Sequence, residues 1–120
     1  MRLLHTGDLH LDSAFRAYGQ RGAEQMREAG RELLRRIFEC AESEKCDMIL
    51  VAGDLFDSRF VSPATEELFC ELAAGAGIPI VISPGNHDPY GARSPYRSAS
   101  FSDNVHIFTE PKISAVDIPS

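Results

Sequence analysis

The hydrophobic and polar positions of the first part of the chain predict three strands separated by two helices. The predicted strands are Arg2–Gly7, Met48–Ala52 and Ile78–Ile82. The second and third are continuous apolar runs, and such runs are typical of strands that are buried on both faces in a parallel sheet. A glycine ends or closely follows each strand, which predicts a sharp turn at its carboxyl end.

Two segments between these strands have helical periodicity. In the first, about Ala23 to Ser43, the predicted buried face comprises Met26, Ala29, Leu33, Leu34, Ile37, Phe38 and Ala41. Its opposite face has two pairs of opposite charge at a spacing of four, Glu32 with Arg36 and Arg35 with Glu39. We therefore expect an amphipathic helix that lies on the sheet.

The second helix is predicted to start at Ser62-Pro63, with serine as the cap and proline at the first helical position. Its predicted buried face is Leu68, Phe69, Leu72 and Ala73, and Gly75 and Gly77 are predicted to end it. The order strand, helix, strand, helix, strand predicts an α/β fold with parallel crossovers.

The remaining segments have weaker patterns. Residues Leu9 to Gly22 resemble a loop, and Asp88 to Asp103 form a polar segment. Short strands are expected near Val105–Phe108 and Ile113–Val116.

Composition excludes some classes of protein. The 120 residues are 43% hydrophobic and 25% charged, as in soluble globular proteins. A net charge of −6 argues against a protein that coats nucleic acid by bulk charge, but it does not exclude a nuclease, because metal ligands are acidic. The three cysteines have no CxxC spacing, and no apolar run is long enough to cross a membrane. We expect a cytoplasmic protein with reduced thiols.

Potential metal ligands follow each of the three predicted strands. The clusters are Asp8-Leu9-His10, Gly53-Asp54-Leu55-Phe56-Asp57 and Gly85-Asn86-His87-Asp88. In open parallel sheets, ligands bind beyond the carboxyl ends of the strands. Asp and Asn are also common in ordinary turns, but three such clusters in succession favour a two-metal site that clamps a phosphate group.

The motifs DxH, GDxxD and GNHD resemble those of the calcineurin-like metallophosphoesterases. Residues 5–13 and 53–57 look most like the SbcD-type DNA-repair exonucleases, and Asp8 to Phe15 is most similar to the YhaO branch. The resemblance covers Met1 to about Phe108 and implies an αββα sandwich of two sheets with helices outside. Residues 1–120 would be the N-terminal part of that nuclease domain.

The resemblance also implies roles for individual residues. Asp8 and His10 would hold the first metal, Asp54 would bridge both metals, and Asn86 would bind the second. His87 would protonate the leaving oxygen or stabilise charge on the phosphate. Asp57 would accept a hydrogen bond from His87 and fix its tautomer.

Cofactors and partners follow from the same resemblance. Two divalent ions are implied, with Mn²⁺ favoured, although this ligand set also suits iron or zinc. The implied partners are DNA and an SMC-like coiled-coil ATPase, and a homodimer is left open. Arg59, Arg93 and Arg97 are candidate contacts for DNA phosphates, although isolated loop arginines are more often only solvated.

One departure from the family pattern concerns histidine. The family completes its site with three further histidines later in the chain, whereas this sequence has only His5, His10, His87 and His106. We therefore expect a chain that is truncated at its C-terminus and inactive by itself. Two rival interpretations remain: a phosphodiesterase or phosphatase for small substrates, which the negative charge mildly favours, and a non-catalytic scaffold.

Overall fold

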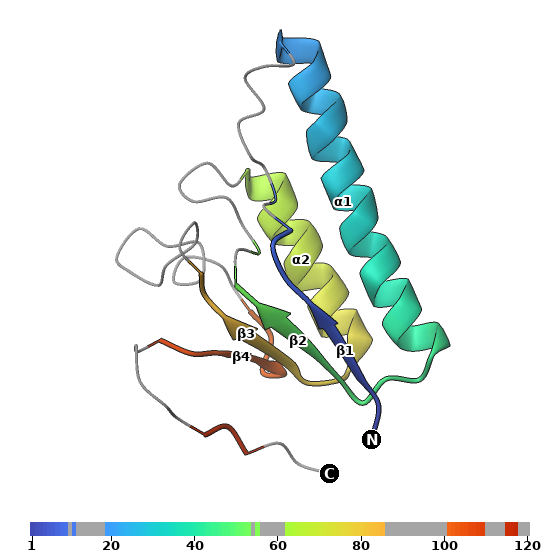
Figure 1. Cartoon of the computed structure of the whole chain (residues 1–120), viewed down its shortest axis with the longest axis vertical. Helices are drawn as coiled ribbons and strands as arrows, with labels where there is room; N and C mark the ends of the chain where they lie inside the picture. Colours follow the sequence, from blue (N-terminus) through green and yellow to red (C-terminus); the bar gives the residue numbers. More distant parts are fainter. Residues whose placement is uncertain are drawn as a thin grey trace.

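The four strands in the described part of the chain form one parallel sheet in chain order. The computed structural model describes residues 1–9, 11, 19–53, 55, 62–85, 101–109 and 115–117. In this part of the chain the elements are β1 (Leu3–Thr6), α1 (Gly19–Ser43), β2 (Met48–Ala52), α2 (Pro63–Ala76), β3 (Ile80–Ser83) and β4 (Val105–Ile107). The sheet order is β1-β2-β3-β4, and every neighbouring pair is parallel (Figure 1). The predicted parallel α/β fold is confirmed.

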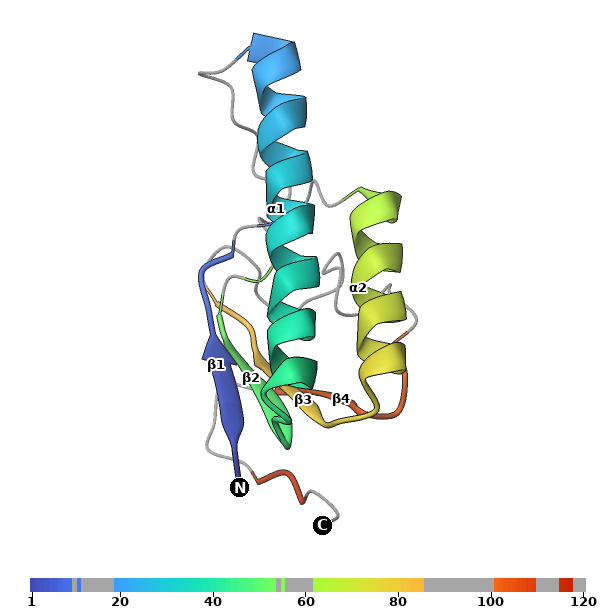
Figure 2. The ribbon, with the colours of Figure 1, turned by 90° about the vertical axis from the view of Figure 1, so that its right-hand side faces the viewer.

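Both helices cover the same face of this sheet (Figures 1 and 2). Leu4, Ile49 and Ile80 are aligned in register on neighbouring strands, and all three belong to the core or pack against it. Phe69 of α2 lies at the centre of this core, 1% exposed, with its ring edge-on to Phe38 and Phe101. The alternation of side chains along each strand thus directs one set of apolar residues to the helices.

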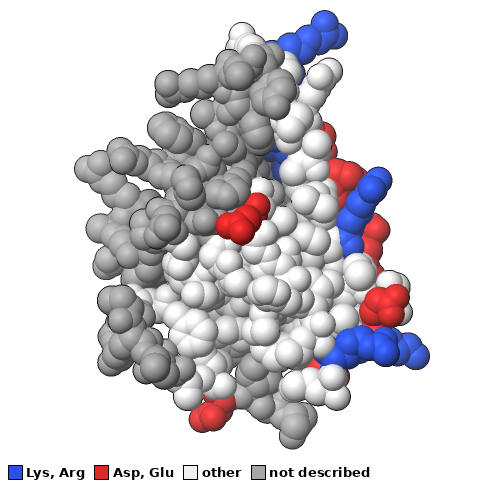
Figure 3. Space-filling model, viewed as in Figure 1, with Lys and Arg blue, Asp and Glu red and all other residues white. Residues whose placement is uncertain are grey.

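The opposite face of the sheet has a different character. His5, Leu50, Val81 and His106 are aligned in register one residue along from the core row, so they lie on this second face. His5 is exposed, whereas Leu50 and His106 are half-buried. Over the strands this face is almost free of charged side chains, which gather instead along the side formed by α1 (Figure 3).

The ends of α2 match their sequence signals. The Ser62 side chain accepts a hydrogen bond of 3.3 Å from the backbone N–H of Thr65, and Pro63 occupies the first helical position. Gly77 ends the helix in the left-handed conformation, with φ of 67°. The serine cap and the stop at Gly77 are confirmed, but Gly75, also predicted to end the helix, lies within its last turn.

The prediction for α1 was partly wrong. The helix begins at Gly19, so residues 19–22, predicted as loop, form its first turn. Apart from half-buried Gly22, these residues are exposed, and hydrophobic periodicity does not register a turn that lies outside the core. Met26 and Leu33, predicted to be buried, are 38% and 48% exposed. Ala29 is exposed as well, whereas Leu34, Phe38 and Ala41 are buried as predicted.

Smaller differences concern charges and strand limits. Glu32 pairs with Arg36 at 3.5 Å as predicted, but Arg35 bonds to Glu28 and Glu32 rather than to Glu39. The third strand is Ile80–Ser83, because Ile78 and Pro79 belong to the turn after α2. Of the predicted strand Ile113–Val116, residues 115 and 116 are not in a strand, and the other two lie outside the described residues.

The three cysteines are free thiols, as expected, with Cys40 exposed and Cys46 buried. Among the described residues, neither helix combines the length and apolarity that crossing a membrane requires.

Candidate metal centre

The three predicted ligand clusters begin at the same edge of the sheet. Strands β1, β2 and β3 are parallel and in register, with Thr6 opposite Val51 and Val51 opposite Ile82. Their carboxyl ends therefore meet at one edge, as the sequence predicted. The turns that carry the first residues of the three motifs leave the sheet there (Figure 1).

Glycines allow these turns to approach one another closely. A Cβ atom on Gly7 would stand 2.7 Å from the carbonyl oxygen of Ala52, closer than real Cβ contacts come. A Cβ on Gly53 would stand 3.4 Å from the Cα of Gly85, and Gly53 has a φ of +80°. The end of β1 thus contacts the end of β2, and Gly53 contacts the backbone that follows β3. A side chain at Gly7 would push the first two turns apart.

Asp8 is held at this edge by its backbone. Its N–H donates a hydrogen bond of 3.1 Å to the carbonyl oxygen of Gly53. Its φ is +54°, in the left-handed region that aspartate tolerates better than most residues. Asp8 is exposed, so this conformation presents a carboxylate at the strand ends, where it can ligate a divalent cation.

A second backbone bond joins the same two turns further out. The N–H of Leu11 donates to the carbonyl oxygen of Leu55 at 2.9 Å. Leu11 and Leu55 are 2% and 0% exposed, so both turns are anchored in the core. His10 and Asp54 stand in sequence between the two bonded pairs. The neighbours of these two predicted ligands are therefore fixed relative to one another.

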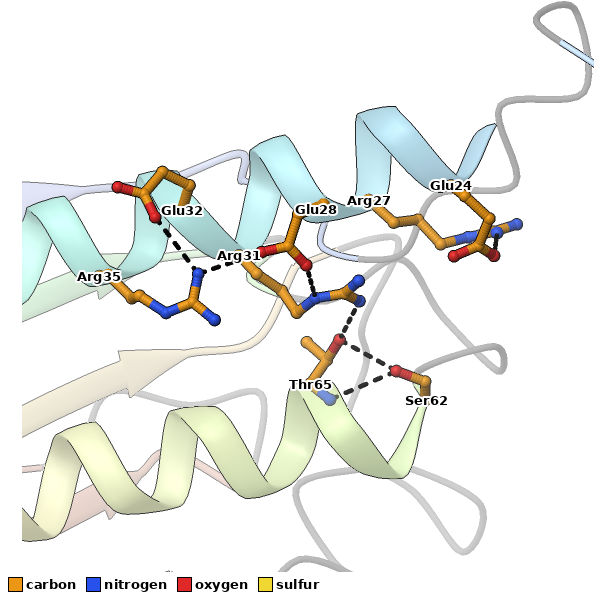
Figure 4. Close-up of polar contacts among 8 residues, drawn as sticks. All are labelled: Glu24, Arg27, Glu28, Arg31, Glu32, Arg35, Ser62 and Thr65. Carbon is orange, nitrogen blue, oxygen red and sulfur yellow. Dashed lines mark hydrogen bonds and ion pairs between the residues drawn. The ribbon is translucent and has the colours of Figure 1, made fainter. Parts of the chain in front are cut away.

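The start of α2 is anchored to α1 by a polar network (Figure 4). Arg31 donates to the hydroxyl of Thr65 at 3.4 Å, and this hydroxyl lies 3.0 Å from that of the cap residue Ser62. Thr65 is fully buried. Arg31 in turn donates to Glu28 at 3.0 Å. The network holds the start of α2 against α1.

Electrostatics along α1 follow from the same contacts. Hydrogen bonds from Arg31 and Arg35 hold the pKa of Glu28 below its ordinary value. In α2, burial raises the pKa of Glu66. Burial and the nearby Glu66 together raise the pKa of the Cys70 thiol. None of these groups belongs to the predicted metal centre.

Of the predicted site residues, the structure places Asp8. The others lie outside the described residues: His10, Asp54, Asp57, Arg59, Asn86, His87, Arg93 and Arg97. Within the described ranges, no three His, Cys, Asp or Glu side chains are grouped as metal ligands would be. The exposed carboxylate of Asp8 and the close glycine contacts fit a divalent-metal site at this edge.

Sequence reasoning missed three contributors to the architecture of the site. Leu11 and Leu55 looked like loop residues, yet they anchor the two turns in the core. Arg31 had no predicted role in the first helix, yet it reaches the start of α2. Only the apolar character of the two leucines between polar neighbours could have signalled their burial.

Comparison with known proteins agrees with this geometry. The family model described as calcineurin-like phosphoesterase matches residues 1–118. The chain is 33% identical over 118 residues to the metallophosphoesterase YhaO of Bacillus subtilis, covering 91% of this chain. It is 29% identical to the SbcD component of the nuclease SbcCD, over 123 residues for the protein of Staphylococcus epidermidis and over 122 residues for that of Bacillus subtilis. These two matches cover 99% and 98% of the chain.

The chain spans about three tenths of the length of these relatives: 28% of YhaO and 31% and 30% of the two SbcD proteins. The matches themselves confirm the resemblance to the YhaO and SbcD proteins that the motifs indicated.

Proposed function

Since the chain belongs to the calcineurin-like phosphoesterase family, we propose that it contributes the first part of a two-metal centre that hydrolyses phosphodiester bonds in DNA. The proposal rests on the convergence of the three strand ends. Gly7 contacts Ala52, Asp8 bonds to Gly53, and Gly53 lies against Gly85. Each contact joins two of the turns that introduce the three motifs.

In the proposed centre, Asp8 and His10 would hold one cation, Asn86 would hold the second, and Asp54 would serve both. When bound, the two cations would supply Lewis acidity that neutralises charge on the phosphate, activates water and stabilises the leaving oxygen. His87 donates a proton to that oxygen. Asp57 accepts a hydrogen bond from the other ring nitrogen of His87.

The substrate and partner are inferred from the relatives. Two of them are named as components of the nuclease SbcCD, which supports DNA as the substrate and an SbcC-type ATPase as the partner. In its most specific form, the proposal is that the protein processes DNA ends during repair. It would do so in the cytoplasm, with Mn²⁺ as the metal. Arg59, Arg93 and Arg97 supply phosphate contacts in this form.

A small phosphodiester is the second candidate substrate. The net charge of −6 favours this substrate. A groove that binds DNA needs positive charge to meet the phosphates, and acidic residues outnumber basic ones in this chain.

The test uses the complete polypeptide that carries this chain. Hydrolysis of linear duplex DNA and of bis-p-nitrophenyl phosphate is measured with added Mn²⁺, for the parent protein and for Asp54→Asn. This substitution retains the shape of the side chain and removes its charge. Asp103→Asn is the matched control, since Asp103 is exposed and precedes β4, at the opposite edge of the sheet.

We expect Asp54→Asn to lose at least a hundredfold in DNA hydrolysis and to bind less metal by elemental analysis, while Asp103→Asn retains both. Hydrolysis of the small diester alone would indicate an enzyme for small phosphodiesters and not for DNA. Metal binding without hydrolysis of either substrate would indicate a non-catalytic scaffold. Equal activity of Asp54→Asn and the parent would refute the two-metal centre.

A further inference from the structure

A hollow lies between the C-terminal halves of α1 and α2, at the end of the sheet opposite the candidate metal centre. Its volume is about 490 Å³, within the range of ligand-binding clefts. The apolar residues that line it come from both helices and the turns that follow them: Phe38, Ala41, Cys46, Leu72, Ala76 and Ile78. The last three are only half-buried, so the hollow offers apolar surface to a partner.

The two helices give this hollow the shape of a groove. Both run antiparallel to the strands that they connect, so they are parallel to each other, and Figure 2 shows them side by side on one face of the sheet. A groove between two helices accepts a third helix, whose side-chain ridges fit between theirs at an interaxial distance of about 8–10 Å.

Negative charge surrounds the groove. The charged residues on its lining are Arg35, Glu39, Glu42, Lys45 and Glu71. The guanidinium of Arg35 bonds to Glu28 and Glu32 at 3.2 and 3.3 Å, so its charge is already compensated. Among the described residues, the three glutamates of the lining form no ion pair. They leave Lys45 as the one uncompensated cation of the described lining, beside three carboxylates.

The helix ends add to this negative field. Both α1 and α2 end at the groove, and neither has a basic residue in its last turn. The last carbonyl groups of each helix form the negative end of its dipole, which attracts cations. Lys45, two residues after α1, and Arg2, which donates a hydrogen bond to the carbonyl oxygen of Glu44, offset part of it. Two independent sources of negative potential thus border one apolar floor.

We propose that this groove is a docking site for an amphipathic helix of a partner protein, with apolar residues on one face and Lys or Arg on its flanks. The apolar face covers the half-buried residues of α2, and the basic flanks meet Glu39, Glu42 and Glu71. This is the helix-in-groove mode of recognition, with charge setting the choice of partner. An acidic helix, an anionic lipid surface or nucleic acid is repelled by the same carboxylates.

The experiment measures binding of a fluorescent helical peptide of about 15 residues, near the shortest length at which an isolated helix is stable. It carries Leu at helical spacing on one face and Lys on its flanks, and a second peptide has Glu in place of each Lys. The protein is the complete polypeptide. Its variant Glu39→Lys/Glu71→Lys reverses two charges at the groove, and Glu67→Lys, exposed on α2 outside the groove, is the matched control.

We expect the Lys peptide to bind the parent and Glu67→Lys alike, and to bind the double variant about tenfold more weakly. The Glu peptide shows the opposite preference, and both effects shrink as salt is added. A photoreactive group on the apolar face of the Lys peptide attaches to residues 35–46 or 71–78.

Any of the following results would overturn the proposal. They are equal affinity of the two peptides for the parent, equal affinity of the Lys peptide for the parent and the double variant, and attachment outside these two segments. Absence of binding to the complete polypeptide would overturn it too, since the groove is then closed or filled by the polypeptide itself. None of these outcomes depends on phosphodiesterase activity, so the two proposals fail or stand separately.

Discussion

The backbone N–H of Asp8 donates a hydrogen bond of 3.1 Å to the carbonyl oxygen of Gly53, and this bond joins the turns that follow β1 and β2. The two residues come from motifs separated by the whole of α1. Their contact brings the first predicted metal ligand to the start of the second motif. The proposed arrangement of the candidate centre depends on this hydrogen bond.

Gly7 is predicted to be essential for the close approach of these turns. Gly7→Ala places a Cβ 2.7 Å from the carbonyl oxygen of Ala52, and backbone atoms must move to relieve the contact. We expect a loss of unfolding free energy on the order of 1–3 kcal/mol, measured by chemical denaturation. Gly30→Ala is the control. Its Cβ would stand 3.6 Å from Leu11, an ordinary contact, and alanine in a helix stabilises by about 0.5–1 kcal/mol. Equal stability of Gly7→Ala and the parent would contradict the close approach.

Ser62 is predicted to stabilise the start of α2. Ser62→Ala removes the hydroxyl that accepts from the N–H of Thr65 and should cost about 1 kcal/mol. Ser43→Ala serves for comparison, because its hydroxyl donates only to Cys40 at the exposed end of α1. We expect a change within about 0.5 kcal/mol for this second variant. Thermal or denaturant unfolding measures both, and indistinguishable values would argue against the cap.

Among the aromatic residues that the structure describes, Phe69 is predicted to contribute most to the core. Its ring is 1% exposed and meets Phe38 and Phe101 edge-on, at centroid distances of 6.1 and 5.8 Å. Phe69→Ala leaves a cavity and should cost about 3–5 kcal/mol. Leu33→Ala, at a residue 48% exposed, should cost less than about 1 kcal/mol. A loss for Phe69→Ala as small as that for Leu33→Ala in denaturant unfolding would mean that this core is not formed.

Glu28 is predicted to make stability depend on pH in the acid range. Its pKa lies below the ordinary value of 4.5 because Arg31 and Arg35 donate hydrogen bonds to the ionised carboxylate. The folded state therefore binds this proton more weakly than the unfolded state. The resulting stabilisation is present above pH 4.5 and is lost as the pH falls through the lowered pKa.

The test compares the melting temperatures of the parent and Glu28→Gln from neutrality down to about pH 3. The difference between them should be largest near neutrality and should shrink in acid. Glu67→Gln, exposed on α2 and without an ion pair among the described residues, should follow the parent throughout. A difference for Glu28→Gln that persists undiminished in acid would show that the carboxylate charge is not its cause.

Several parts of the fold were determined by local sequence alone. The continuous apolar runs of β2 and β3 predicted strands in a parallel sheet, because such runs are typical of parallel pairing. Ser62-Pro63 and Gly77 set the limits of α2, because capping and left-handed turns depend on the residue types at those positions. The places of the three polar clusters could be predicted as well, because each cluster comes shortly after a predicted strand.

Only the tertiary structure decided which side chains are buried and which turns touch. The apolar spacing of α1 includes both Leu33 and Leu34, and the sheet covers Leu34 because the helix axis and its rotation are set by packing with α2 and the strands. The bond from Asp8 to Gly53, the burial of Leu11 and Leu55 and the reach of Arg31 to Thr65 join residues far apart in the chain. Local patterns cannot specify such pairs, because each depends on the register of neighbouring strands and on where two helices lie against them. The sequence by itself thus determined the elements and the residue types for a metal centre, and tertiary packing brought the turns that carry its first residues to one edge of the sheet.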